Sequence, residues 1–201
     1  MELTARELRK LRSLNTPYKI QQYLEHLPYH DAATAWSPRL VLREGTAHCL
    51  EGAILAAAAL RVNGFPPLLW DLEAVQDSDH VLAIFKVNEH WGAIAKSNWA
   101  GLRYREPVHR SLRELAISYF DSYFNLRGDR SLRAFSRPVD LARFDRREWM
   151  TTEDDVWFIA DHLVDIAHEQ LLTRKMEAAL NRLDERTKAA GLYGHDQWKP
   201  R

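Results

Sequence analysis

Apolar positions near the start of the chain recur every three or four residues, whereas the middle of the chain carries short continuous apolar runs. Helical periodicity, with apolar residues on one side and charged residues on the other, predicts two amphipathic helices over residues 3–14 and 16–27. Residues 29–39 show no period and predict a connecting loop, and residues 40–42 form a short apolar stretch after it. The chain is therefore expected to open with two surface helices, each with one apolar face.

The longest apolar run, residues 53–60, consists of alanine, leucine and isoleucine, which favour a helix. This helix is expected to begin near Cys49 and to end at Asn63-Gly64, because glycine supplies the left-handed backbone that closes many helices. Apolar runs separated by polar breaks then predict three antiparallel strands, over residues 68–75, 80–87 and 90–97. A buried helix followed by such strands is typical of α+β proteins.

Helical periodicity returns in the second half of the chain. One helix is predicted over residues 111–124, residues 132–144 are irregular, and a final helical region is predicted from residue 152 to 183. We therefore expect a single α+β domain in which an antiparallel sheet packs on a central cysteine-bearing helix, with flanking N- and C-terminal helices. Its expected parts are N-terminal helices (residues 1–37), a catalytic-type core (38–125) and a C-terminal helical extension (126–201).

Composition narrows the class of protein. With 28 basic and 28 acidic side chains in 201 residues, the formal net charge is zero, so no general attraction to nucleic acid or membrane surfaces is expected. A single cysteine excludes an intrachain disulfide and is typical of a reducing compartment. The first residues are charged and lack the apolar core of a secretory signal, and the run at 53–60 is too short to span a bilayer. A cytoplasmic protein is therefore expected.

Cys49 is the first candidate for chemistry, because it lies where a loop becomes a helix. Unpaired amides and the positive end of the helix dipole favour a thiolate there, whereas the alternative is a buried cysteine that serves as a small apolar residue. A nucleophilic thiol needs a base, and His80 at the start of the second strand is the best candidate. Ser97 and Asn98, at the far end of the third strand, are the short polar residues placed to hold the imidazole in one tautomer.

A metal centre is an alternative to a thiol nucleophile at these positions. His48, Cys49, His80 and His90 are of the residue types that zinc prefers. Adjacent ligands such as His48-Cys49 rarely both point inward, and the chain has no Cys-x-x-Cys or His-Glu-x-x-His motif. We therefore expect neither a metal nor a cofactor.

Several motifs of residues 41–98 follow one another in a definite order. They are His48-Cys49-x-Glu51-Gly52-Ala53, an Ala/Leu-rich helix, Asn63-Gly64-Phe65-Pro66, a strand, Asp79-His80-Val81, and a strand that bears Trp91. This order resembles the transglutaminase-like superfamily, which includes transglutaminases, peptide N-glycanases and many bacterial cysteine hydrolases with papain-like Cys-His-Asp or Cys-His-Asn sites. The resemblance implies that Cys49 is a nucleophile and that His80, 31 residues later, is its base.

The sequence departs from the family pattern at two positions. The family's aspartate, four residues after the tryptophan, would fall on Ala95, which cannot orient a histidine, and the usual aromatic residue two after the histidine is Leu82. Asn98 is the preferred substitute for the aspartate, and it reaches the site where the strand ends or bulges. Ser97, which keeps the strand parity of Trp91, is the alternative.

These expectations converge on acyl transfer. The chain is expected to be a cysteine-dependent hydrolase or acyltransferase that acts on amide bonds of a peptide, protein or small amide, as thiol proteases, amidases and transglutaminases do. Trp91, Arg103 and Arg105 are the residues expected beside the substrate, because the arginines follow the third strand and can receive an anionic group. For the arginines, the alternative is an ordinary solvated face. The alternative function is a catalytically inactive relative that serves as a binding or scaffold module, and no nucleic acid or membrane partner is expected.

Overall fold

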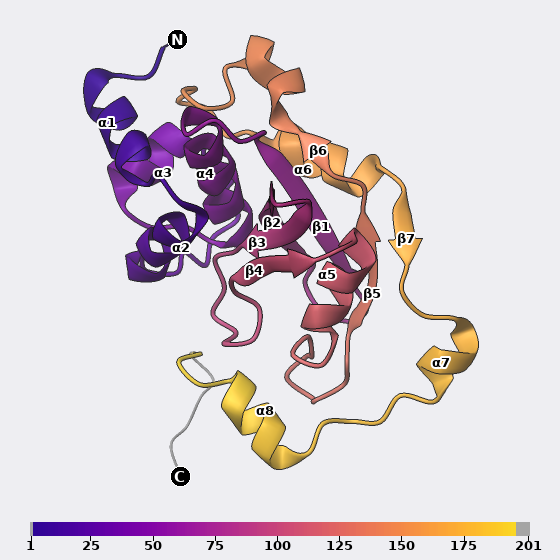
Figure 1. The fold of residues 1–201 in the computed structure, drawn as a ribbon. Coiled ribbons are helices and arrows are strands. Elements are labelled where there is room, and N and C mark those ends of the chain that lie inside the picture. The colour runs from indigo at the N-terminus through magenta and orange to yellow at the C-terminus, as the bar shows by residue number, and fades with distance from the viewer. Residues whose placement is uncertain (1, 196–201) are drawn as a thin grey trace.

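The computed structural model of the protein describes residues 2–195, so the last six positions of the expected C-terminal extension lie outside the described residues. Its centre is an antiparallel sheet of seven strands with helices on both faces (Figure 1). Helix α4 (Cys49–Val62) packs on one face, and helix α5 (Leu112–Phe120) packs on the other. The prediction of an α+β fold, with an antiparallel sheet against the cysteine-bearing helix, is confirmed.

Three further helices lie beside α4 in the N-terminal quarter of the chain. They are α1 (Ala5–Ser13), α2 (Pro17–His26) and α3 (Pro38–Glu44). The prediction of a loop followed by a short apolar stretch was wrong for α3. Ser37 caps the backbone amide of Leu40, and Pro38 occupies the first turn. A helix of seven residues is too short to show a period in the sequence.

The strands follow the order β4-β3-β2-β1-β5-β7, and β6 pairs separately with β1. Every one of these neighbouring pairs is antiparallel. The strands are β1 (Leu68–Ala74), β2 (His80–Val87), β3 (His90–Ile94), β4 (Arg105–His109), β5 (Leu132–Ser136), β6 (Val139–Asp140) and β7 (His168–Gln170). The strands predicted at residues 68–75 and 80–87 match β1 and β2, whereas β3 ends three residues before its predicted end.

Side chains alternate between the two faces of the sheet, which gives the protein two cores. Leu69 and Ala83 face α4, in the core that holds the apolar residues of that helix. Leu82 and Trp70 face α5, in the core that holds Tyr119. The alanine-rich run of α4 is buried throughout, which is why its sequence shows no polar face.

The second half of the chain contains strands where helix or irregular structure was predicted. The segment called irregular holds β5, β6 and a 3-10 helix (Leu141–Arg147), and the predicted helix from residue 152 is interrupted by β7. The helices there are α6 (Trp157–Asp165), α7 (Arg174–Ala178) and α8 (Glu185–Gly191). β5 pairs with β1, and β7 with β5, so these strands depend on partners distant in the sequence. No helix in the described range is long and apolar enough to cross a membrane.

Residues 173–195 form a C-terminal arm that runs along the outside of the molecule and includes α7 and α8 (Figure 1). None of the residues described in this arm is buried. Backbone hydrogen bonds attach it to the rest of the protein. The Leu183 amide donates to the Gly128 carbonyl at 2.9 Å, and the Ala100 amide donates to the Gly191 carbonyl at 3.1 Å.

Candidate active site at the start of helix α4

Cys49 is the first residue of α4, as predicted, and polar groups surround its sulfur. The backbone amides of Leu50 and Val81 lie near the sulfur and act to lower the pKa of the thiol. The Tyr29 hydroxyl lies in the same cavity as Cys49, close enough that the two groups raise each other's cost of ionisation. Because Val81 belongs to β2, the sulfur lies between the first turn of α4 and the sheet.

A buried carboxylate fixes the loop that leads into α4. Glu51 has no solvent exposure, and it accepts hydrogen bonds from the backbone amides of His48 and Trp36 at 3.1 and 3.2 Å. The Thr34 hydroxyl donates to it at 2.6 Å. The rings of His30 and His48 contact the same carboxylate at 3.2 and 3.4 Å. Because these groups converge on one buried side chain, they hold the turn before the helix in one conformation.

His80 begins β2 and is 5% exposed, so its ring lies inside the protein. Ring atom Nε2 lies 2.9 Å from the backbone carbonyl oxygen of Leu102. Because a carbonyl oxygen only accepts, Nε2 carries the proton, and Nδ1 is the nitrogen that can accept one. The ring also packs edge-on against Tyr123, with the ring centroids 6.5 Å apart. A histidine held in one tautomer is the form that a general base requires.

Cys49 and His80 line the same cavity, which has a volume of about 240 Å³. Ser97 also lines this cavity, together with Tyr29 and Tyr123. Asn98 is not among the described residues of the cavity wall. The structure therefore brings together three of the predicted site residues, from α4, β2 and the loop after β3.

The group that holds His80 is a backbone carbonyl rather than the predicted side chain of Asn98 or Ser97. The Ser97 hydroxyl oxygen instead accepts a hydrogen bond from the backbone amide of Trp99 at 3.0 Å. Because β3 ends early, the chain beyond it leaves the sheet as a loop, and this loop places the Leu102 carbonyl against the ring. A residue that acts through its backbone has no signature in the sequence.

The structure does not bring Trp91, Arg103 or Arg105 into this cavity. Trp91 lines a different cavity, between α5, β5 and β7. Arg103 is half-exposed, 4.0 Å from Glu25, and its Nε donates to the backbone carbonyl of Ser97 at 3.3 Å. Arg105 points into the protein, where its guanidinium stacks on Tyr119 and donates to backbone carbonyls. The arginines that were expected to receive substrate are therefore placed at the surface and in a structural network.

Burial sets the ionisation state of the thiol and the imidazole. It raises the pKa of the Cys49 thiol, and this effect outweighs the backbone amides of Leu50 and Val81, which favour the thiolate. It lowers the pKa of His80 to about 4, while the Leu102 carbonyl acts in the opposite direction. This direction is opposite to the predicted stabilisation of a thiolate, because desolvation outweighs the amides even though Cys49 keeps part of its surface exposed in the cavity. Both groups are neutral near pH 7, and no hydrogen bond joins them within the described part of the chain.

A second buried pair lies on strands β1 and β7. Asp71 lies 3.0 Å from Nε2 of His168, and Nδ1 of the same ring lies 2.9 Å from the Ile166 carbonyl oxygen. Burial raises the pKa of Asp71 to about 6, whereas its contact with His168 acts in the opposite direction. The charge of Asp71 in turn raises the pKa of Cys49. Sequence reasoning had placed His168 on a helix and had not selected Asp71.

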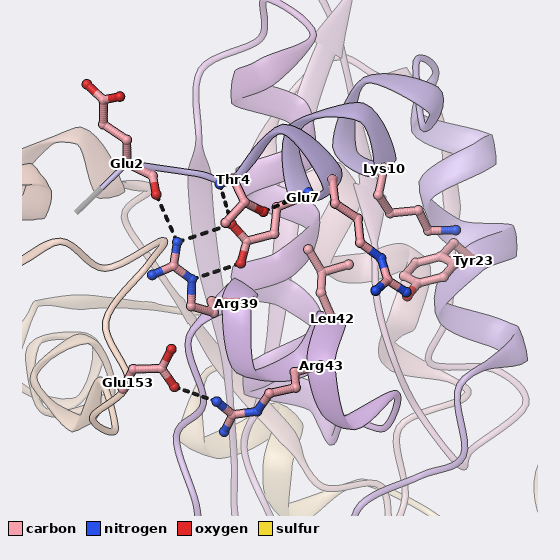
Figure 2. Close-up of a pocket in the computed structure, with 10 residues that line it drawn as sticks. Glu2, Thr4, Glu7, Lys10, Tyr23, Arg39, Leu42, Arg43 and Glu153 are labelled. Carbon is pink, nitrogen blue, oxygen red and sulfur yellow. Dashed lines mark hydrogen bonds and ion pairs between the residues drawn. The ribbon is translucent and has the colours of Figure 1, made fainter.

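A larger cavity, of about 810 Å³, lies beside α1 and α3 at the N-terminal end of the molecule (Figure 2). Arg39 donates to both carboxylate oxygens of Glu7, at 2.8 and 3.1 Å, and Arg43 lies 2.5 Å from Glu153. The Arg39–Glu7 pair connects α3 with α1, and the Arg43–Glu153 pair connects α3 with the segment before α6. The described lining contains neither a thiol nor an imidazole, so this cavity is not the candidate active site.

Sequence reasoning missed Tyr29, Tyr123 and the Leu102 carbonyl. Tyr29 lies in the segment predicted as a loop, and a backbone bridge to Ala47 brings it beside the cysteine. Tyr123 was expected only as part of a helix, but it follows α5 and its hydroxyl donates to the Ser78 carbonyl at 2.8 Å. No periodicity or motif marks either tyrosine, because both act through contacts between distant segments.

No family model matches this chain, and no curated protein is similar to it. The resemblance to the transglutaminase-like superfamily therefore rests on the order and spacing of the motifs, and it stays a prediction.

Proposed function

We propose that the protein catalyses acyl transfer through a thioester on Cys49, with an amide of a peptide, protein or small molecule as the acyl donor. One observation carries the proposal. The thiol of Cys49 and the ring of His80 line the same cavity, and the Leu102 carbonyl leaves Nδ1 of the ring as the proton acceptor. A nucleophile, a base and a group that orients the base are the components of thiol-based acyl transfer.

In this mechanism Nδ1 of His80 takes the thiol proton while the sulfur of Cys49 attacks the carbonyl carbon. The tetrahedral oxyanion collapses, the carbon–nitrogen bond breaks, and His80 returns the proton to the departing amine. Water then attacks the thioester with His80 as base, which releases the carboxylic acid product and restores the thiol. An amine in place of water gives a new amide. Because both groups start neutral, the proton moves during the attack rather than before it.

Tyr29 lies beside one of the donors available to the oxyanion. Its hydroxyl lines the same cavity, near the backbone amide of Cys49. The amide of a nucleophile at a helix start is a natural donor to the oxyanion.

Acetylation by 4-nitrophenyl acetate tests the proposal. The wild-type protein should gain one acetyl group on Cys49, measured by mass spectrometry of the intact protein and its peptides. Cys49→Ala should abolish this adduct, and His80→Gln should slow its formation by on the order of 100-fold, as expected for loss of a general base. His90→Gln is the matched control, because the His90 ring contacts the Asn88 carbonyl in a surface turn. Equal rates for wild type and His80→Gln would contradict the proposal.

A non-catalytic binding module is the second candidate, and the raised pKa of the buried thiol is the observation that favours it. Under this alternative, native Cys49 resists both 4-nitrophenyl acetate and iodoacetamide up to about pH 9, above the ordinary thiol pKa. It becomes reactive only after unfolding in denaturant. Acetylation of the native thiol below pH 8 that depends on His80 excludes this alternative.

A further inference from the structure

Arg105 organises the loop that carries the carbonyl bound to His80. Its guanidinium donates to the carbonyl oxygens of Gly101 and Tyr104, at 2.8 and 3.1 Å. The same guanidinium also donates to Ser118 in α5, both to its hydroxyl oxygen and to its backbone carbonyl oxygen, each at 3.1 Å. The guanidinium also stacks on Tyr119, with its central carbon 3.9 Å from the ring centroid. Arg105 therefore connects two points of the loop to one helix.

These two points lie on either side of Leu102. Between them, the Tyr119 hydroxyl donates to the carbonyl of Arg103 at 2.8 Å. The carbonyls of Gly101, Arg103 and Tyr104 are thus held by Arg105 and α5, while the Leu102 carbonyl faces His80. The direction of the Leu102 carbonyl is set by these neighbouring contacts.

The positive charge of Arg105 is unfavourable for folding, because the guanidinium is largely removed from water. Burial lowers its pKa, and no acidic group contributes to its environment among the described residues. A desolvated guanidinium without a carboxylate is unfavourable, and an apolar side chain of similar size would fill the space without this cost. Unlike an apolar side chain, the planar fork of the guanidinium can donate hydrogen bonds to several carbonyl oxygens at once.

We propose that Arg105 is a positioning residue for the acyl transfer proposed above, on which this inference rests. It fixes the loop so that the Leu102 carbonyl keeps His80 protonated on Nε2, with Nδ1 open to the thiol proton. The carbonyl thereby takes the position expected for the side chain of Asn98 or Ser97. Because a carbonyl carries no charge, it fixes the tautomer of the ring without the attraction to an imidazolium that a carboxylate would add.

Nitrogen-15 NMR of histidine-labelled protein measures the tautomer directly. Wild-type His80 should show the Nε2-protonated form alone. Arg105→Lys keeps the charge but loses the fork, and Arg105→Gln loses both, so each should shift His80 toward a mixture of tautomers. Tyr119→Phe removes one carbonyl contact and should give a smaller shift. Arg110→Gln is the control, because the Arg110 side chain is exposed just beyond the end of β4, and it should leave the spectrum unchanged.

The rate of Cys49 acetylation by 4-nitrophenyl acetate is the second readout. It should fall about tenfold in both Arg105 variants, as expected for a misplaced base, and stay unchanged in Arg110→Gln. Thermal melts establish that the variants fold, and Tyr119→Phe carries the test if the Arg105 variants do not. A wild-type tautomer spectrum in all folded Arg105 and Tyr119 variants overturns the proposal. A shifted tautomer in a protein whose wild type does not acetylate supports the role of Arg105 in orienting His80 and overturns only the proposed function.

Discussion

The start of α4 and the C-terminal arm both border the Cys49 cavity, but they are held in place by different means. At the start of α4, the fully buried Glu51 accepts hydrogen bonds from two backbone amides and a hydroxyl. The arm reaches the cavity with His195, whose ring lies 4.8 Å from the ring of Trp99. None of the described residues of the arm is itself buried.

This contrast implies different local stabilities around one cavity. Hydrogen bonds to a buried carboxylate are expensive to break, because the freed donors find no water. Segments with few buried contacts open at little cost in free energy. The cavity therefore has a rigid wall that carries the thiol and a second wall that can open toward solvent.

Glu51→Ala should give the largest effect. It leaves several buried donors without an acceptor, so we expect a loss of at least about 3 kcal/mol in the free energy of unfolding, measured by urea denaturation. Glu44→Ala is the matched control, because Glu44 is exposed and its contact with Arg43 is a surface ion pair. If Glu51→Ala lowered the free energy of unfolding by less than about 1 kcal/mol, the start of α4 would be no more firmly held than the arm.

Two buried groups of the sheet, His80 on β2 and Asp71 on β1, should give opposing pH dependences of the free energy of unfolding. The pKa of His80 is lowered to about 4, so the unfolded chain binds its proton first and stability falls as pH drops from about 6.5 to 4. The pKa of Asp71 is raised to about 6, so the folded chain binds that proton more tightly and stability falls as pH rises from about 4 to 6. Each contribution amounts to up to about 3 kcal/mol.

In Asp71→Asn only His80 remains, so the free energy of unfolding should rise more steeply between pH 4 and 6 than in the wild type. In His80→Gln only Asp71 remains, so the free energy of unfolding should fall as pH rises over the same range. Urea denaturation at pH 4, 5 and 6 measures both slopes. Parallel pH profiles for wild type and both variants would show that neither group titrates differently in the folded protein.

Gly191→Val should loosen the arm while leaving the rest of the fold intact. A Cβ at Gly191 would lie 2.5 Å from the ring of Phe124, so a larger side chain must push α8 away. We expect less than about 1 kcal/mol of lost global stability and a rate of Cys49 acetylation by 4-nitrophenyl acetate at least about threefold higher, because the cavity opens. Ala190→Val, on the exposed side of α8, is the control for the loss of helix propensity. Slower acetylation in Gly191→Val would show that the arm supports the site instead of covering it.

Arg182→Gln should give the smallest effect. Arg182 is 72% exposed and pairs with Asp129 at 2.7 Å, so its loss should change the free energy of unfolding by about 0.5 kcal/mol or less. Denaturation in low and high salt checks this value. A larger, salt-dependent loss would mean that the arm is held more firmly than its exposure indicates.

Local patterns determined much of the core. The alanine-rich run predicted α4 with Cys49 at its first turn, and the runs at residues 68–75 and 80–87 predicted β1 and β2. These elements are continuous in the chain and buried on at least one face, so their residues show the period or the apolar run themselves. His80 at the head of β2 followed from the same pattern. The resemblance to a family gave the roles proposed for Cys49 and His80, and those roles stay predictions.

Tertiary structure alone decided the remaining strands and the surroundings of the thiol. β5 and β7 exist because they pair with strands that are remote in sequence, and three or five residues carry no such information. The partner of His80 is a carbonyl, a group that every residue has, so no residue type could reveal it. The pKa of Cys49 depends on how far the fold shields the thiol from water, and this partial burial acts against the expected effect of the helix start. The sequence placed the thiol at the start of a helix, whereas packing decided its charge and which groups face it.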